Sequence, residues 1–219
     1  PSFYTHTYNE DGTIKEIIPH EGAPKTVTKR IVQDMDAAYY PTDPIVPSTQ
    51  IIHDRTVLEL FRGCIRGCRF CQAGFCYRPV RPKSPERLYD LAVKSLENSG
   101  YDEMTLSSLS TSDYKKLGEF ADRMLDYCIP RGINLSLPSL RADNFSVELM
   151  EKVQKVRKSG LTFAPEAGTQ RLRDVINKNL TEEDLLHSCR IAFEGGWSSV
   201  KLYFMLGLPT ETDEDIVEI

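Results

Sequence analysis

Three cysteines in one short run constrain this chain more than any other feature of its sequence. Cys64, Cys68 and Cys71 directly follow residues 56–61, whose β-branched and apolar side chains predict a strand. Clustered thiolates suit an iron–sulfur cluster, and a 4Fe–4S cluster usually takes four of them. A loop that supplies only three can leave one iron open to a small molecule. The pattern therefore predicts a cluster that serves substrate chemistry.

Two other metal sites also fit cysteines at this spacing. Zinc would need Cys76 or a distant histidine as its fourth ligand, but zinc sites usually pair two Cys-x-x-Cys motifs and no second pair occurs. A ferredoxin-like electron carrier would close its cluster with Cys76 and leave no open iron. Cys128 and Cys189 are expected to be small buried hydrophobic residues. The four histidines offer no pair at a metal-ligand spacing.

Composition indicates a globular chain without a membrane segment. Of its 219 residues, 40% are hydrophobic and 27% are charged, which is ordinary for a folded domain. No apolar run approaches the roughly 18 residues of a membrane span, and the first residues do not form a secretory signal. We expect a cytoplasmic location, because an oxidising compartment would destroy cluster ligation.

Charge is unevenly distributed along the chain. The net charge of −5 argues against a generally cationic nucleic-acid binder. Between residues 62 and 83, however, six cations occur without an acidic residue. This run fits a solvated basic face that offsets a negative cluster, and it also fits a docking patch for RNA, a phosphorylated substrate or an acidic electron donor. The six residues are Arg62, Arg66, Arg69, Arg78, Arg81 and Lys83.

Residues 1–54 are predicted to form an N-terminal extension. Residues 3–8 and 13–18 are rich in aromatic and β-branched side chains and flank a polar turn, which predicts a β-hairpin. Residues 26–32 predict a further strand. Three prolines between residues 41 and 47 then favour an extended, packed connection over a helix.

From residue 55 onward, segments typical of strands alternate with segments typical of helices. About five strands with intervening helices predict a parallel α/β sheet with right-handed crossovers. An open doubly wound sheet and a partial barrel both fit this order. The expected strands are 56–61, 104–106, 133–137, 161–163 and 198–206, and the expected helices are 85–98, 112–128, 147–156 and 182–194.

The cysteine spacing, the strand before it and Phe70 directly before the third cysteine together resemble the radical S-adenosylmethionine (SAM) superfamily. The resemblance implies that Cys64, Cys68 and Cys71 bind a 4Fe–4S cluster whose open iron is chelated by SAM. An electron from the reduced cluster then cleaves SAM, and the resulting 5′-deoxyadenosyl radical abstracts hydrogen from a substrate. The resemblance also implies a partial (β/α)6 barrel over residues 55–219, with its site at the carboxyl ends of the strands.

We expect the chain to stop before that barrel is complete. Thr212 fits the N-cap of a helix whose first turn is acidic, and only a few residues follow. Because an average helix needs about three turns, the barrel is expected to be truncated after its fifth strand. A last strand is expected after residue 219, and further domains are expected upstream and downstream of this sequence.

The resemblance assigns SAM-binding roles to residues that follow the strands. Phe70 is expected against the adenine and Glu166 near the ribose hydroxyls, beside a close backbone approach at Gly168. Arg141 would hold the SAM carboxylate or a substrate anion. The alternatives are ordinary salt bridges for Glu166 and Arg141, a serine-rich turn without ligand at residues 107–111, and strand packing for Leu206. The expected cofactor-binding residues are Phe70, Ser107, Ser108, Ser110, Ser139, Arg141, Glu166, Gly207 and Leu208, and no catalytic residue is assigned.

Longer motifs, above all residues 78–81 and 160–168, are similar to one bacterial branch of the superfamily. Its members usually carry a cobalamin-binding-type domain before the barrel, and their reaction is unassigned. This chain has no Asp-x-His-x-x-Gly segment, so any cobalamin site would lie upstream of it. The branch implies a radical enzyme of unknown substrate, with RNA or protein considered and methyl or sulfur transfer as candidate reactions. A flavodoxin- or ferredoxin-type protein is the expected electron donor.

Overall fold

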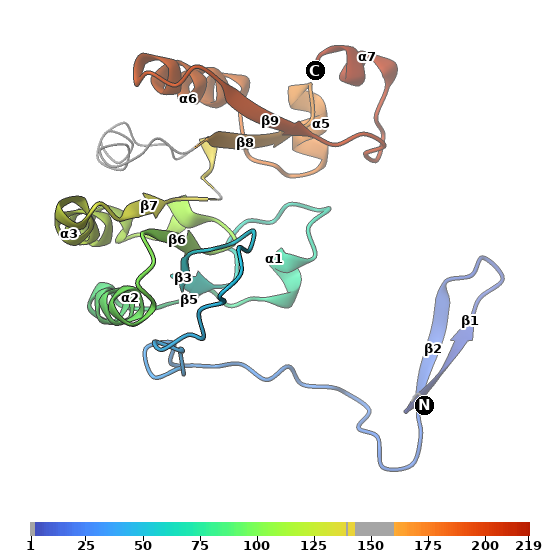
Figure 1. The fold of residues 1–219 in the computed structure, drawn as a ribbon. Coiled ribbons are helices and arrows are strands. Elements are labelled where there is room, and N and C mark those ends of the chain that lie inside the picture. Colours follow the sequence, from blue (N-terminus) through green and yellow to red (C-terminus); the bar gives the residue numbers. More distant parts are fainter. Residues whose placement is uncertain (1–2, 139, 143–159) are drawn as a thin grey trace. The chain divides into compact units, whose positions relative to one another are not determined.

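The computed structural model describes residues 3–138, 140–142 and 160–219. The chain divides into two compact units, Pro1–Gln33 and Asp34–Ile219. The first unit holds a β-hairpin, and the second holds the parallel strands and the helices (Figure 1). Among the described residues, no helix combines the length and apolar character needed to cross a lipid bilayer.

The predicted hairpin is present in the first unit. Strands β1 (Tyr4–Tyr8) and β2 (Ile14–Pro19) pair antiparallel. In the turn, Asp11 Oδ1 accepts hydrogen bonds from the backbone nitrogen and the hydroxyl of Thr13, at 3.0 and 2.6 Å. Residues 26–32 form no strand, so that prediction is wrong. β-Branched residues stabilise a strand mainly through neighbours in a sheet, and these residues join no ladder.

A parallel three-stranded sheet begins the second unit. Its order is β3 (Thr56–Glu59), β6 (Glu103–Ser107) and β7 (Asn134–Ser136). Helices α2 (Pro85–Ser99) and α3 (Leu117–Cys128) connect successive strands and lie along one face of the sheet (Figure 1). The predicted alternation of parallel strands and helices is confirmed here.

The core lies between this sheet and its two helices. Leu58 and Leu106 of the strands pack with Leu88 and Phe120 of the helices, and all four are fully buried. Burial of such side chains contributes about 1.5–3 kcal/mol each. Cys128 joins the same cluster, and burial raises the pKa of its thiol to about 11. Its thiol therefore stays protonated at neutral pH and packs as a small hydrophobic group.

A second parallel pair follows, made of β8 (Leu161–Glu166) and β9 (Val200–Phe204). Helix α6 (Glu182–Glu194) connects the two strands and has the predicted bounds. Thr181 and Asp184 form a capping box at its start, because each side chain accepts a hydrogen bond from the other residue's backbone nitrogen. All five predicted strands are thus present.

Shorter helices complete the unit. Helix α5 (Gln170–Val175) follows β8, and α7 (Asp213–Val217) starts directly after Thr212, the predicted N-cap. The helix predicted at residues 147–156 lies outside the described residues. Very short helices are α1 (Ala73–Cys76), η1 (Thr111–Asp113) and η2 (Ile129–Arg131), the last two of the 3-10 type.

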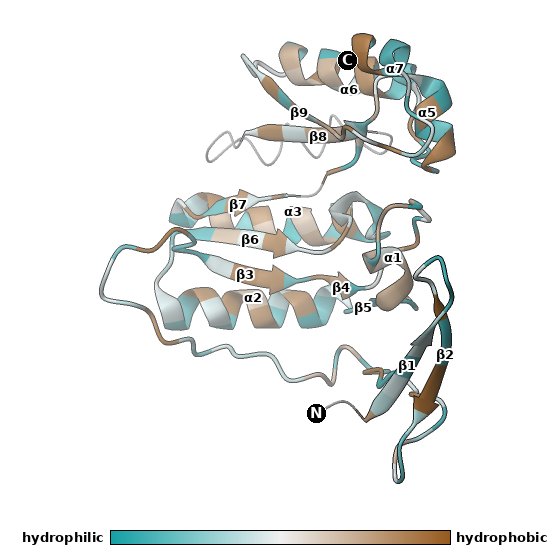
Figure 2. Cartoon of the chain, turned by 90° about the vertical axis from the view of Figure 1, so that its right-hand side faces the viewer, coloured by the Kyte–Doolittle hydropathy of each residue, from teal (hydrophilic) through white to brown (hydrophobic). Residues whose placement is uncertain are grey.

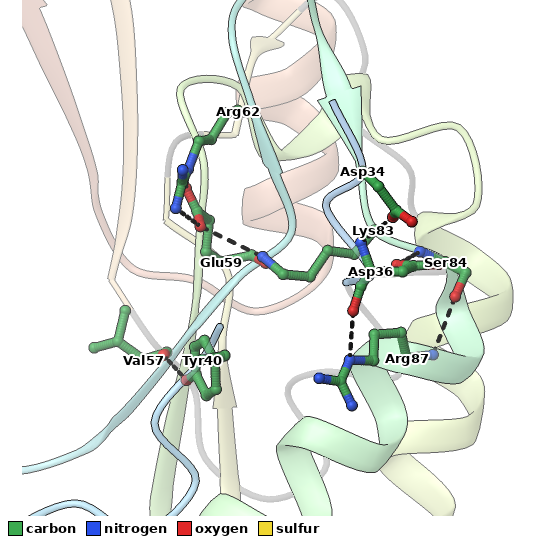
Figure 3. A network of polar contacts seen from close by, with 9 residues as sticks. All are labelled: Asp34, Asp36, Tyr40, Val57, Glu59, Arg62, Lys83, Ser84 and Arg87. Atoms are coloured by element: carbon green, nitrogen blue, oxygen red, sulfur yellow. Dashed lines mark hydrogen bonds and ion pairs between the residues drawn. The ribbon is translucent and has the colours of Figure 1, made fainter. Parts of the chain in front are cut away.

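A short ladder and a buried lysine close the loop that contains the cysteines. Strands β4 (Phe61–Arg62) and β5 (Arg81–Pro82) pair antiparallel, and Lys83 follows directly. The Lys83 side chain is 2% exposed, and its ammonium donates to the Glu59 carbonyl at 2.8 Å and to the Glu59 carboxylate at 3.4 Å (Figure 3). Two hydrogen bonds from Arg62, at 2.7 and 3.1 Å, hold the same carboxylate.

The start of the second unit is fixed to α2 in the same region (Figure 3). Asp36 Oδ1 accepts a hydrogen bond of 2.7 Å from the Ser84 backbone nitrogen, and the Asp36 carbonyl accepts one of 3.0 Å from Arg87. The Tyr40 hydroxyl donates to the Val57 carbonyl of β3. These contacts place the polar start of α2 against the segment before β3.

Replacing Lys83 with methionine is expected to lower the free energy of unfolding by about 1–3 kcal/mol, because charged hydrogen bonds to Glu59 are lost while the apolar volume is kept. Urea unfolding of the apoprotein measures the change. K94M is the matched control, since Lys94 is exposed and pairs with Asp90 on the surface of α2. Equal effects of the two substitutions would show that the buried contacts of Lys83 contribute no more than a surface pair.

Candidate functional site

The cysteines lie on a loop that leaves the carboxyl end of the first parallel strand and returns through β5. Gly63 opens this loop with a φ of +97°. The backbone nitrogen of Cys71 donates to the Cys68 carbonyl at 3.1 Å, and the nitrogen of Arg66 points at the Cys64 sulfur at 3.3 Å. Local hydrogen bonds therefore shape the loop around its sulfur atoms.

The three predicted ligands line one cavity of about 280 Å³. Cys64 is buried, while Cys68 and Cys71 are partly exposed. The loops after the second, third and fourth parallel strands supply other walls of the same cavity. The carboxyl ends of parallel strands are the usual place of a site in α/β proteins. Four further predicted residues line it: Phe70, Ser110, Arg141 and Glu166.

Among the described residues, four predicted ones do not line this cavity: Ser107, Ser108, Gly207 and Leu208. The Ser107 carbonyl accepts a hydrogen bond from Leu60, and the Ser108 hydroxyl lies 3.0 Å from that of Thr111. Leu208 is buried in a cluster with Leu172, and the Gly207 nitrogen donates to Glu211. Ser139 lies outside the described residues.

Gly168 makes the predicted close approach, but to the protein itself. A Cβ at this position would lie 2.5 Å from the carbonyl oxygen of Asp215 and 2.9 Å from the nitrogen of Ile219. Both atoms belong to the end of the chain around α7. The glycine therefore lets that segment pack on the start of α5, and it does not face the cavity.

Glu166, which lines the cavity, has an uncommon backbone conformation at the end of β8. The pairing of β8 with β9 shifts register between Phe163 and Glu166, and Glu166 has a φ of +71°. A positive φ in a residue other than glycine costs about 1–3 kcal/mol and is frequent at functional sites. Its carboxylate lies 3.0 Å from the Lys178 ammonium, which also lines the cavity. Glu166 thus joins a salt bridge and borders the cavity at once.

Ser110 offers a buried polar group. Its side chain is 3% exposed, and its hydroxyl makes no hydrogen bond of normal geometry among the described residues, although it lies close enough to Asp113 to help lower the pKa of that carboxyl. A buried hydroxyl without a well-formed hydrogen bond costs free energy, which a polar ligand atom in the cavity would recover. This observation favours a ligand that carries a hydrogen-bonding group beside Ser110.

Most of the basic run is engaged within the loop and its supports, so it is more than a solvated face. Arg66 holds Asp113 with two hydrogen bonds of 2.5 and 2.9 Å. Burial opposes the charge of Asp113, but these bonds outweigh it and keep the pKa of that carboxyl below its usual value. Arg81 donates to the Pro79 carbonyl at 3.0 Å. The Arg78 side chain donates to the Arg66 carbonyl at 3.2 Å.

The opposite wall of the cavity is organised by Arg173. This guanidinium is buried and donates to the carbonyls of Ala167, Gly168 and Leu180, at 2.9, 2.9 and 3.1 Å. It also bonds Gln170 at 3.1 Å. One side chain therefore joins the segment after β8 to the residues that border the cavity beyond α5.

Asn177 connects the two walls. Its side-chain amide donates to the Gly67 carbonyl at 2.8 Å, although the two residues are 110 positions apart. Arg69 reaches the same region, because its backbone nitrogen donates to the Ile176 carbonyl at 2.9 Å and its side chain to the Val175 carbonyl. The middle of the cysteine loop therefore rests on the end of α5, directly before Lys178.

Replacing Asn177 with glycine should weaken this support without straining the backbone, since Asn177 already has a φ of +54°. Loss of the bond to Gly67 costs about 1 kcal/mol. We expect a chelator to remove iron from the reconstituted protein about 5-fold faster, followed by absorbance. The control N179G removes an exposed amide two residues away. Identical iron release from both variants would show that Asn177 does not support the loop.

The donor set fits an iron–sulfur cluster with an open position. Among the described residues, three thiols and no carboxylate other than Glu166 border the cavity, and Glu166 is already paired with Lys178. Cys76 is exposed at the end of α1 and does not line the cavity, which disfavours it as a fourth ligand. Among the described residues, no three His, Cys, Asp or Glu side chains converge enough to hold a single metal ion. A 4Fe–4S cluster places each thiolate on a different iron, so its ligands need not converge.

Comparison with known proteins decides the family. The model of the radical SAM superfamily matches residues 58–219, from β3 to the end of the chain. The chain belongs to the radical SAM superfamily. Membership implies a 4Fe–4S cluster and SAM as cofactors, in agreement with the cysteine loop.

Individual relatives are similar over much of the chain. An uncharacterized protein of Methanocaldococcus jannaschii is 34% identical over 213 residues, which cover 97% of this chain and 45% of that protein. The radical SAM methyltransferase TsrM from Kitasatospora setae, solved with cobalamin and a 4Fe–4S cluster, has a TM-score of 0.61 at 15% identity over 74% of this chain and 32% of its own. The cobalamin-dependent radical enzyme OxsB has a TM-score of 0.56 at 16% identity over 97% of this chain and 31% of its own. These two structures show a shared fold, and the chain spans less than half of each protein.

Several important residues of the site are absent from the sequence prediction. Arg173 lies within α5, and Asn177 and Lys178 follow that helix. The available signal was the group of polar residues in and just after the segment that follows the fourth strand. Their partners could not be identified, because Gly67 and Glu166 are distant in sequence.

Proposed function

We propose that this chain is the cluster- and SAM-binding core of a radical SAM enzyme. The observation that carries the proposal is the shared cavity, in which Cys64, Cys68 and Cys71 face the ends of the other parallel strands. Bound there, the cluster and SAM would supply one-electron cleavage of SAM to a 5′-deoxyadenosyl radical. The three thiolates would hold the cluster and leave its fourth iron to SAM.

Within this proposal, the chain's own residues bind and orient SAM. Phe70, which is 38% exposed, would stack on the adenine, and the buried Ser110 hydroxyl would meet a polar group of SAM. Arg141 and Lys178 would bring positive charge to the carboxylate. Glu166 would accept hydrogen bonds from the ribose hydroxyls beside its ion pair with Lys178.

The wider organisation is also a proposal. Residues 55–219 would form a partial (β/α)6 barrel that is incomplete after its fifth strand, and residues 1–54 would form an N-terminal extension. Methyl or sulfur transfer to RNA or protein remain the candidate reactions, and cobalamin would bind in a further domain of the whole protein. TsrM and OxsB were solved with cobalamin, which supports cobalamin as a cofactor of the whole protein.

Anaerobic reconstitution tests the proposal. We expect a cluster whose electron paramagnetic resonance (EPR) spectrum changes when SAM is added, and formation of 5′-deoxyadenosine after reduction with dithionite. A cluster spectrum that ignores SAM would favour the electron-carrier alternative instead. Zinc without iron in the purified protein would favour a structural metal site.

A further inference from the structure

The cysteine loop brings positive charge to the site that the loop itself does not balance. Between residues 62 and 83 the sequence holds six cations and no acidic residue. Arg66 is the cation nearest to the thiols in sequence on both sides, because it lies between Cys64 and Cys68 and lines the cavity with them. Its backbone nitrogen is 3.3 Å from the Cys64 sulfur. The guanidinium is therefore within one side-chain length of a ligand sulfur.

The carboxylate that meets this charge comes from the loop after β6, 47 positions further along the chain. Asp113 ends η1, and its two oxygens accept hydrogen bonds of 2.9 and 2.5 Å from the Arg66 guanidinium. The Asp113 side chain is 7% exposed and the Arg66 side chain is 22% exposed. A bidentate pair of this kind has a fixed geometry, and its burial limits screening by salt.

Neighbouring hydrogen bonds hold η1, the short helix that carries Asp113. Thr111 is fully buried, and its hydroxyl donates to the Pro138 carbonyl at 2.7 Å. The Ser112 hydroxyl accepts a hydrogen bond of 3.2 Å from the backbone nitrogen of Arg141. Both contacts tie η1 to the segment after β7. The carboxylate is thus held in place independently of the cysteine loop.

We propose that Asp113 is a positioning residue that neutralises Arg66 and thereby keeps the reduction potential of the cluster low. Reduction adds one negative charge to a cluster, so a nearby unbalanced cation stabilises the reduced form and raises the potential. A neutralised Arg66 leaves the reduced cluster a stronger reductant. Cleavage of SAM by one electron needs a strong reductant, so a low potential serves the reaction. This inference rests on the proposed function, since it needs a cluster in the loop.

The two partners should have opposite effects on the potential. Arg66 lines the cavity, whereas Asp113 is not among the described residues that do. Removing the charge of Asp113 leaves a cation beside the cluster, and removing the charge of Arg66 leaves an anion behind it. The first change raises the potential and the second lowers it. A pair that only closed the loop would give both variants the same defect.

A redox titration followed by EPR spectroscopy tests these signs. Wild-type protein, D113N and R66Q are reconstituted without oxygen and titrated with titanium(III) citrate in the absence of SAM. The titanium(III) ion loses one electron, the oxidised cluster gains it, and no covalent bond of the protein forms or breaks. At the wild-type midpoint, we expect the ratio of reduced to oxidised cluster to rise at least about 5-fold in D113N and to fall at least about 5-fold in R66Q. Each change equals about 40 mV, at about 59 mV per tenfold for a one-electron couple.

Two further variants serve as controls. R66Q/D113N removes both charges and should return to within about 2-fold of the wild-type ratio. E103Q breaks a comparable ion pair, since Glu103 lies 2.5 Å from Arg55 and these side chains are 13% and 29% exposed. Glu103 starts β6, and Figure 2 shows that β3 and β6 both run toward the side on which β4 and α1 lie. This pair is at the end of β6 away from the cysteine loop, so E103Q should leave the potential unchanged.

Each outcome supports or overturns the inference. Shifts of the same sign in D113N and R66Q, no shift in D113N, or an equal shift in E103Q would overturn it. Loss of iron from D113N while E103Q keeps its cluster would show that the pair only closes the loop, which also overturns it. If R66Q alone loses its cluster, a raised potential in D113N still supports the inference.

Failure of the proposed function is a separate result. A wild-type cluster that forms no 5′-deoxyadenosine with dithionite refutes SAM cleavage, whereas the potentials are measured without SAM and still test the pair. Zinc without iron in the wild-type protein refutes both.

Discussion

The C68A variant, purified and reconstituted without oxygen, is expected to hold no stable 4Fe–4S cluster and to form no detectable 5′-deoxyadenosine. With Cys68 removed, the cavity offers only two thiols, and two thiolates do not retain a cubane cluster against chelators. We expect bound iron to fall from about four atoms per chain to a small fraction of that, and SAM cleavage to fall by more than about 100-fold. Iron and sulfide analysis and chromatography of the nucleoside products measure both quantities.

The C76A variant is the matched control for this result. Cys76 is exposed, lies five residues after Cys71 and does not line the cavity. We expect the same iron content and SAM-dependent EPR change as in the wild-type protein. If C76A instead loses its cluster as completely as C68A, all four irons are held by thiolates and the open position does not exist. The protein would then be an electron carrier.

Local sequence signals predicted the elements of this fold well. Residues 182–194 are the clearest case, because the predicted helix and α6 have the same bounds. The strands after residue 55 were predicted because β-branched and apolar runs alternate with amphipathic segments. The failure at residues 26–32 has the opposite cause: the side chains favour a strand, but a strand needs a neighbour, and the sequence does not say whether one exists.

The candidate site was predictable only where one short segment supplies the chemistry. The cysteine loop is such a segment, and its thiols line the cavity as expected. Contacts between distant segments were beyond reach, as the bond between Asn177 and Gly67 shows. Glu166 and Arg141 line the same cavity as the cysteines because the carboxyl ends of parallel strands meet at one edge, and their SAM-binding roles stay a prediction. Lys178 was missed because the chain returns to that edge only after α5.

Replacing Gly63 with alanine is expected to prevent the cysteine loop from closing. A Cβ at Gly63 would lie 2.7 Å from the Tyr77 carbonyl oxygen and 2.8 Å from the Pro79 carbonyl oxygen, and both are backbone atoms that no side-chain rotation can move. Strain at the φ of +97° adds to this overlap. Together they should lower the free energy of unfolding by about 3 kcal/mol or more. Urea unfolding of the apoprotein measures the loss.

The G100A variant separates the two causes. Gly100 ends α2 with a φ of +71°, and nothing lies within 4 Å of a Cβ built there. Backbone strain alone should therefore cost about 1 kcal/mol, and cluster assembly should be unaffected. G63A should lose both stability and most of its bound iron, since the overlap pushes β4 away from the return of the loop toward β5. Equal stability of the two variants, with full iron in G63A, would show that the loop reaches its cluster-binding form without the close packing at Gly63.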